Sequence, residues 1–218
     1  MFVGGLHSPK GLVLDGRTLY TSDIDELVEI DITTRTVTRY PAEGASSLND
    51  PAVGPDGTVY VTDFFGQRIY QRRGAARRGA AVSVLLKTDT LDSPNGLLDD
   101  DRALYVASWW IITDPQTFGT DVPGKVLRVD LDDLSILDVT SPFGNLDGIE
   151  PRGSSFYVAD WGKGGRLTEI TAEGEVRTII DDLGDPVDHE YIEDTDTVII
   201  PIQIDDTRST LIAYRLTR

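Results

Sequence analysis

One pattern recurs five times along this chain of 218 residues, and no other feature of the sequence constrains the fold as strongly. In each copy a polar loop leads into a short apolar segment, a turn follows, and a second segment rich in β-forming residues comes next. The five copies read SPKGLVLDGRTLYTSD, LNDPAVGPDGTVYVTD, SPNGLLDDDRALYVAS, NLDGIEPRGSSFYVAD and PVDHEYIEDTDTVIIP. Self-similarity at a spacing of 40 to 52 residues indicates a repeat architecture.

Each copy predicts a four-stranded unit. Third strands are expected at VEID, RIYQ, VLRVD, LTEI and LIAYR, and fourth strands over residues 36–40, 82–86, 135–139 and 176–180. No fourth strand follows LIAYRLTR, so we expect the N-terminal MFVGGL to supply an outer strand that closes the ring onto the last unit. The sequence therefore predicts one all-β domain over residues 1–218, a β-propeller of five four-stranded blades closed by the N-terminal strand; the alternative is a fragment of a six-bladed propeller.

One position recurs at the start of the first strand of every unit, ten residues before a Tyr or Val of the second strand. The residues at this position, called slot residues below, are Lys10, Asp50, Asn95, Asp147 and Asp188. In an antiparallel blade whose innermost strand comes first, the start of that strand and the end of the next lie at one edge of the sheet. We therefore expect the slot residues to ring one mouth of the central channel.

The slot residues, with Asn49 and His189 beside them, predict a metal site. Carboxylate and amide oxygens are the ligands that a hard cation such as Ca²⁺ requires. Three carboxylates in one place also need compensating charge, which a metal or Lys10 would supply. The alternative is that these Asp and Asn side chains only cap the loops that enter each strand. His189 is a candidate for proton transfer, with a purely structural role as its alternative.

Two further features fall near the same mouth. The second strands end on Asp23, Asp63, Ser108 and Asp160, for which turn capping is the favoured interpretation. The longest insertion, residues 109–124, begins with Trp109 and is expected to overhang the channel. Its aromatic residues predict either a wall of a binding pocket or a loop that packs its own apolar side chains on the blade.

Composition excludes several classes of function. A net charge of −17 disfavours a nucleic-acid partner, and the one basic cluster, which comprises Arg72, Arg73, Arg77 and Arg78, is interpreted as an exposed loop. Cysteine is absent, which removes disulfides and thiol chemistry. No apolar run is long enough to span a membrane and no signal peptide is visible, so we expect no membrane partner and either a cytoplasmic or a processed exported protein. The oligomeric state stays open.

At these residues the sequence resembles the gluconolactonase, regucalcin and senescence-marker-protein family of calcium-dependent propellers. The family places ND, NG and DG pairs at successive blade tops, and this chain has Asn49-Asp50, Asn95-Gly96 and Asp147-Gly148 there. The resemblance implies that Asn95 and Asp147 bind the metal and that Asn49 contacts substrate or a metal-bound water. It also implies that Asp147 is the general base that activates water. The chain departs from the family in lacking its opening-blade glutamate and a sixth unit.

The functional expectation is a calcium-dependent lactonase or esterase-like hydrolase with its metal on the propeller axis. Asn95 and Asp147 would bind Ca²⁺ or another divalent cation, completed by Asp50 or Asp188. A small-molecule substrate would contact Asn49, Lys10 and Trp109, while Asp147 and His189 would carry the catalytic proton transfers. The alternatives are a non-enzymatic propeller that binds a ligand or a protein, and an engineered or truncated repeat protein.

Overall fold

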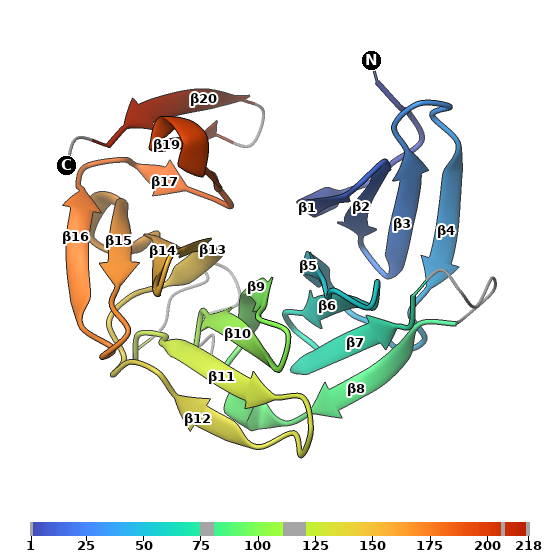
Figure 1. Ribbon diagram of the computed structural model, residues 1–218, viewed down its shortest axis with the longest axis horizontal. Helices are drawn as coiled ribbons and strands as arrows, with labels where there is room; N and C mark the ends of the chain where they lie inside the picture. Colours follow the sequence, from blue (N-terminus) through green and yellow to red (C-terminus); the bar gives the residue numbers. More distant parts are fainter. Residues whose placement is uncertain (1, 75–80, 111–120, 206–207, 217–218) are drawn as a thin grey trace.

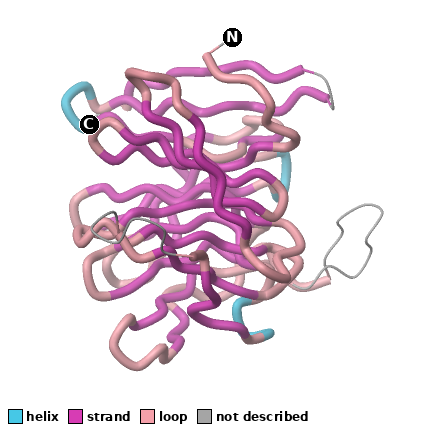
Figure 2. The backbone as a smooth tube through the Cα atoms, turned by 90° about the vertical axis from the view of Figure 1, so that its right-hand side faces the viewer, coloured by secondary structure: helices cyan, strands magenta, loops and turns pink. Residues whose placement is uncertain are grey.

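The computed structural model describes residues 2–74, 81–110, 121–205 and 208–216. Five antiparallel sheets surround a central axis, each with its first strand innermost (Figure 1). Seen from the side, the strands cross the molecule and the loops gather at opposite faces (Figure 2). Within the described ranges the helices are three short 3₁₀ turns, η1 (Asp89–Leu91), η2 (Gly162–Gly164) and η3 (Glu193–Thr195). The prediction of an all-β propeller with five blades is confirmed.

The strands follow the predicted order, from the axis outward in each blade. Blade 1 contains β1 (Pro9–Asp15), β2 (Thr18–Asp23), β3 (Glu26–Asp31) and β4 (Val37–Pro41). Blade 2 contains β5 (Leu48–Val53), β6 (Val59–Asp63), β7 (Arg68–Arg72) and β8 (Ser83–Lys87). Blade 3 contains β9 (Pro94–Asp99), β10 (Ala103–Ser108), β11 (Val126–Asp130) and β12 (Ile136–Asp138). Blade 4 contains β13 (Leu146–Arg152), β14 (Ser155–Asp160), β15 (Arg166–Ile170) and β16 (Val176–Ile180).

Blade 5 differs from the others. Its innermost position is shared by two short strands, β17 (Asp185–Pro186) and β18 (Glu190–Ile192), which both pair with β19 (Thr197–Asp205). Outside β19 lies β20 (Arg208–Arg215), and no further strand follows it in the part of the chain that the structure describes. The blade therefore has four strands but only three strand positions, as the missing fourth segment in the sequence predicted.

The predicted closure by the N-terminal strand is wrong for the described residues. Residues 2–8 form no strand, and β20 pairs only with β19 there. Hydrogen bonds hold the segment on blade 1 instead: the backbone N–H groups of His7 and Ser8 donate to Asp23, and Arg39 donates to the Gly5 carbonyl. These bonds direct the N-terminal backbone across its own blade and away from the edge of blade 5.

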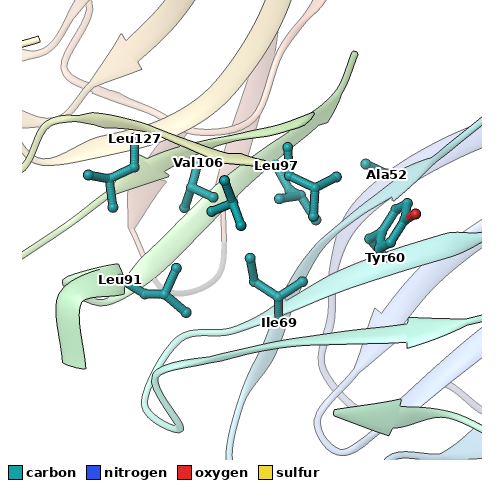
Figure 3. Close-up of a cluster of buried hydrophobic side chains, with 9 residues drawn as sticks. Ala52, Tyr60, Ile69, Leu91, Leu97, Val106 and Leu127 are labelled. Carbon is teal, nitrogen blue, oxygen red and sulfur yellow. The ribbon is translucent and has the colours of Figure 1, made fainter. Parts of the chain in front are cut away.

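The core consists of four apolar clusters, each packed between two neighbouring blades. In the cluster between blades 2 and 3, Ile69 of β7 faces Leu97 and Val106 of β9 and β10 (Figure 3). Full burial of an aliphatic side chain of this size contributes about 1.5–3 kcal/mol to the stability of the folded state. Alternating apolar residues on the strands thus hold adjacent blades together and fix the innermost strands around the axis.

The carboxylates that end the second strands cap loops, as the sequence predicted. Asp63 is fully buried and accepts the N–H groups of Ser46, Ser47 and Gly66. Asp23 and Asp160 accept N–H groups from the equivalent loops of blades 1 and 4. Each carboxylate therefore fastens the loop that leads into the innermost strand of its own blade, and that loop positions the slot residue.

The basic cluster does not behave as one exposed loop. Arg72 is 3% exposed, and its guanidinium carbon lies 3.8 Å from the centroid of the Tyr40 ring in the neighbouring blade. Arg77 and Arg78 lie outside the described residues. For Arg72 the predicted exposure is wrong, because its aliphatic stem and planar head pack well between two blades.

Candidate functional site

Irregular pairing at the slot positions shapes the top of the channel. The register between the first two strands shifts between Pro9 and Leu12 in blade 1, and between Leu48 and Pro51 in blade 2. Blades 3 and 4 show the same shift at their slot residues, Asn95 and Asp147. Such bulges bend a strand and redirect side chains. They turn the slot region of four blades toward the axis.

The glycine that follows a slot residue allows the innermost strand of the next blade to pack closely against it. A Cβ on Gly96 would collide with the backbone carbonyl of Asp147, and one on Gly11 would collide with Asp50. A Cβ on Gly148 would lie 2.8 Å from the Asp188 Cα. Neighbouring innermost strands therefore approach too closely for any side chain at these positions. The NG and DG pairs have a packing requirement for their second residue.

A cavity with a volume of about 640 Å³ occupies this end of the axis. Its lining contains five of the predicted site residues from the slots and their neighbours. These are Lys10, Asn49, Asn95, Asp147 and Asp188, from all five blades. The predicted convergence of the blade tops on one cavity is thus present for this set, and Trp109 lines the cavity as well.

A belt of hydrogen bonds links the amides of three blades. The Asn49 Nδ2 donates to Asn95 Oδ1, and the Asn95 Nδ2 donates to the Leu146 carbonyl at 3.0 Å. Thr62 Oγ1, from the second strand of blade 2, donates to the Asn95 carbonyl at 2.7 Å. Asn95 is only 3% exposed, so these bonds fix its side-chain orientation at the cavity floor.

Burial raises the pKa of both carboxyls that line the cavity. The pKa of Asp147 rises to about 6, although Trp161, Asn95 and Lys10 each lie close enough to lower it in part. Burial and repulsion by Asp147 raise the pKa of Asp188 to about 7. Removal of a carboxylate from water disfavours its charged form, and a second carboxylate nearby adds to that effect. The floor of the cavity would therefore gain from a bound positive charge.

Asp50 is the one slot residue that does not line this cavity. It lines a second cavity of about 500 Å³ further along the axis, together with Glu150 and Asp188, and does not line the first. Its Oδ2 accepts the Leu97 N–H at 2.8 Å. Burial, followed by repulsion from Asp188, raises the pKa of Asp50 well above its usual value, and burial raises the pKa of Glu150 to about 9.

His189 is buried behind the cavity floor. It is 5% exposed, it lines neither cavity, and neither ring nitrogen has a hydrogen-bond partner in the described structure. Burial lowers the pKa of His189 to about 4, so the imidazole is neutral at physiological pH. The predicted role in proton transfer stays a prediction; the backbone N–H of His189, and not its ring, donates to Asp188 Oδ1.

An aromatic wall was largely missed by the sequence reasoning. Trp109 was expected near the cavity, but Phe64, Phe65 and Trp161 line it too. Phe64, Trp109 and Trp161 each directly follow the last residue of the second strand in blades 2, 3 and 4. The aligned pairs DF, SW and DW would have given this signal. Of the insertion that follows Trp109, residues 111–120 lie outside the described residues.

The cavity holds side-chain oxygens that are candidate ligands for a metal ion. Among the described residues, no three or more His, Cys, Asp or Glu side chains are grouped so as to hold one. The cavity does bring together two carboxyls and two side-chain amides, Asp147, Asp188, Asn49 and Asn95. Amide and carboxylate oxygens suit Ca²⁺ in their chemistry, so the side-chain oxygens of these four residues are the donors that a cation in this cavity would use.

The fold and the cavity define a β-propeller with an axial site, and solved structures agree with this class. The chain is similar to a protein in the crystal structure of a nidogen/laminin complex (18% identity, TM-score 0.76), covering 95% of this chain and 76% of that one. It is also similar to streptogramin B lyase (14% identity, TM-score 0.65), and the match covers 88% of this chain and 61% of that one. A third similar structure is a putative TolB from Agrobacterium tumefaciens (16% identity, TM-score 0.68), and the match covers 96% of this chain and 79% of that one.

These similarities concern the fold. This chain spans less than two thirds of the length of the lyase and about three quarters of the other two proteins. No protein-family profile matches the sequence, and a search of curated proteins found no match. The chain is a β-propeller protein whose structural neighbours differ in function. In the described part of the chain, no helix has the length and apolar character needed to cross a membrane.

Proposed function

We propose that the axial cavity binds a small lactone or ester and hydrolyses it with the help of a divalent cation, Ca²⁺ in the first instance. The observation that carries the proposal is that Lys10, Asn49, Asn95, Asp147 and Asp188 line one cavity. Polar side chains that converge in an otherwise apolar concave site are typical of small-molecule sites. The matching ND, NG and DG pairs of the gluconolactonase-like family support the choice of reaction.

Asn95, Asp147 and Asp188 would hold the cation. A bound cation would polarise the carbonyl oxygen of the substrate. Asp147 would accept a proton from the attacking water. The oxygen of that water would form the new bond to the carbonyl carbon of the substrate. The ring or ester C–O bond then breaks, and the proton held on Asp147 passes to the released alkoxide oxygen. A carboxyl with a pKa near 6 suits a general base close to neutral pH.

Lys10 and Asn49 would orient the substrate from two sides of the cavity. Lys10 is the slot residue of blade 1, and its ammonium group already lowers the pKa of Asp147. The side chain of Asn49 is fixed by its hydrogen bond to Asn95, so its side-chain oxygen is held in one place. Both residues provide polar contacts without contributing a further carboxylate.

The test is calcium titration by calorimetry, followed by a lactone hydrolysis assay on the same samples. Asp147→Ala is compared with Asp100→Ala, which removes an equal charge at an exposed turn outside both cavities. We expect calcium binding and calcium-dependent hydrolysis in the wild type and in Asp100→Ala, and loss of both in Asp147→Ala. Absence of calcium binding in the wild type would refute the metallohydrolase.

The second candidate is a propeller that binds a protein through its loops. The observation that favours it is the similarity to a propeller from a nidogen/laminin complex, which aligns over 95% of this chain. A protein-binding role predicts that substitution of the buried cavity residues Asn95 and Asp147 leaves partner binding intact. Retained partner capture together with absent hydrolysis would select this candidate.

A further inference from the structure

A repeated aromatic position builds one wall of the axial cavity. Phe64, Trp109 and Trp161 occupy the same place in three successive blades, just after the second strand. The ring centroids of Phe64 and Trp109 are 6.2 Å apart, and those of Trp109 and Trp161 are 5.4 Å apart, both edge to face. Phe65 extends the row at 5.0 Å from Phe64. The contacts form a continuous aromatic wall from blade 2 to blade 4.

Acidic groups lie at the foot of this wall. Asp147 and Asp188 line the same cavity, and Trp161 lies close enough to Asp147 to lower the pKa of that carboxyl. The net charge of −17 further attracts cations and repels anions at long range. Only Lys10 contributes a positive side chain to the described lining of the cavity. The site thus combines negative charge with the faces and edges of aromatic rings.

We propose that the axial cavity binds a small organic ammonium ion, with the cationic head beside the aromatic wall and the carboxylates of Asp147 and Asp188 below it. Aromatic rings attract ammonium groups through their quadrupole, and this attraction is strongest when the ion is desolvated. An anionic ligand would face two carboxyls. An organic cation is complementary to both halves of the site, and its binding depends on neither bound Ca²⁺ nor hydrolysis.

The test is a titration in EDTA, so that metal binding does not contribute. Choline is the probe, and 3,3-dimethyl-1-butanol, its neutral isostere, is the matched control; binding is followed by calorimetry and tryptophan fluorescence. We expect choline to bind with an affinity at least about tenfold above that of the isostere. Equal affinities, or no saturable binding of choline, would overturn the proposal.

Variants separate the two halves of the site. Trp161→Leu and Trp161→Phe both fill the position, but only Phe keeps a π face, so the Leu variant should lose at least about fivefold more choline affinity. Asp188→Asn should weaken choline binding and leave binding of the isostere unchanged. Equal losses in the two Trp161 variants would contradict the role of the wall, and an unchanged affinity in Asp188→Asn would contradict that of the floor. Choline binding without calcium-dependent hydrolysis would leave this inference standing while refuting the proposed function.

Discussion

Substitution of Asp147 by Asn should stabilise the metal-free protein at alkaline pH. Asp147 is held in a site that disfavours its charge, and Asn keeps the shape of the side chain while it carries no charge. A folded-state pKa above the unfolded value means that stability is fully present below the unfolded pKa and is lost as pH rises through the folded pKa. For Asp147 the window runs from about pH 4 to just above pH 6.

The magnitude follows from the two pKa values. A rise from 3.8 to about 6 corresponds to at most about 3 kcal/mol of disfavoured ionisation. The cavity is open to water and salt, which screen part of this repulsion. We therefore expect Asp147→Asn to gain about 1–3 kcal/mol over the wild type at pH 8 and almost nothing at pH 4.

Urea unfolding in EDTA at both pH values measures the difference. Asp100→Asn is the control, since it removes the same charge from an exposed turn. A gain that appears at pH 8, disappears at pH 4 and is absent from the control would support the electrostatic explanation. An Asp147→Asn variant that is no more stable than the wild type at pH 8 would refute it. Excess Ca²⁺ should then stabilise the wild type and not the variant, if Asp147 is a ligand.

Three further predictions concern the same framework. Gly148→Ala should destabilise the protein by about 1–3 kcal/mol in urea unfolding, because the new Cβ meets the Asp188 backbone; an unchanged midpoint would contradict this close approach. Asp63→Ala should lower the free energy of unfolding by about 1–3 kcal/mol, because buried N–H groups lose their acceptor. A decrease below roughly 0.5 kcal/mol, the scatter of surface substitutions, would exclude the capping role. His189 has a lowered folded pKa, so its stability contribution is lost as pH falls from about 6.5 towards 4; His189→Gln should reduce this acid sensitivity by up to about 3 kcal/mol, and an identical pH profile would contradict the prediction.

The repeat pattern predicted the fold because one strand order satisfies all five copies. Alternation of apolar residues fixed which face of each strand meets the neighbouring blade, as Ile69 and Leu97 illustrate. The N-terminal closure was predicted from the need to cover an open edge. That need was outweighed by specific hydrogen bonds that residues 5–8 form with Asp23 and Arg39.

The site was predicted in outline but not in detail, for a physical reason. Counting from the second strand placed Asn95, Asp147 and Asp188 at one mouth, and they line one cavity. The same count could not show that Asp50 lines a different cavity, because sequence spacing alone does not determine the direction of a side chain. Phe64 and Trp161 were missed because each follows a strand end that was considered only for its capping carboxylate.

The motif residues carry two separable requirements. Gly96 and Gly148 are needed for packing, since no side chain fits between adjacent innermost strands. Their presence would therefore be expected in a propeller of this geometry with any function. Close packing of the strands does not require a carboxyl at position 147, and burial of Asp147 opposes its ionisation. Asp147, rather than the glycine after it, is therefore the residue on which both functional proposals depend.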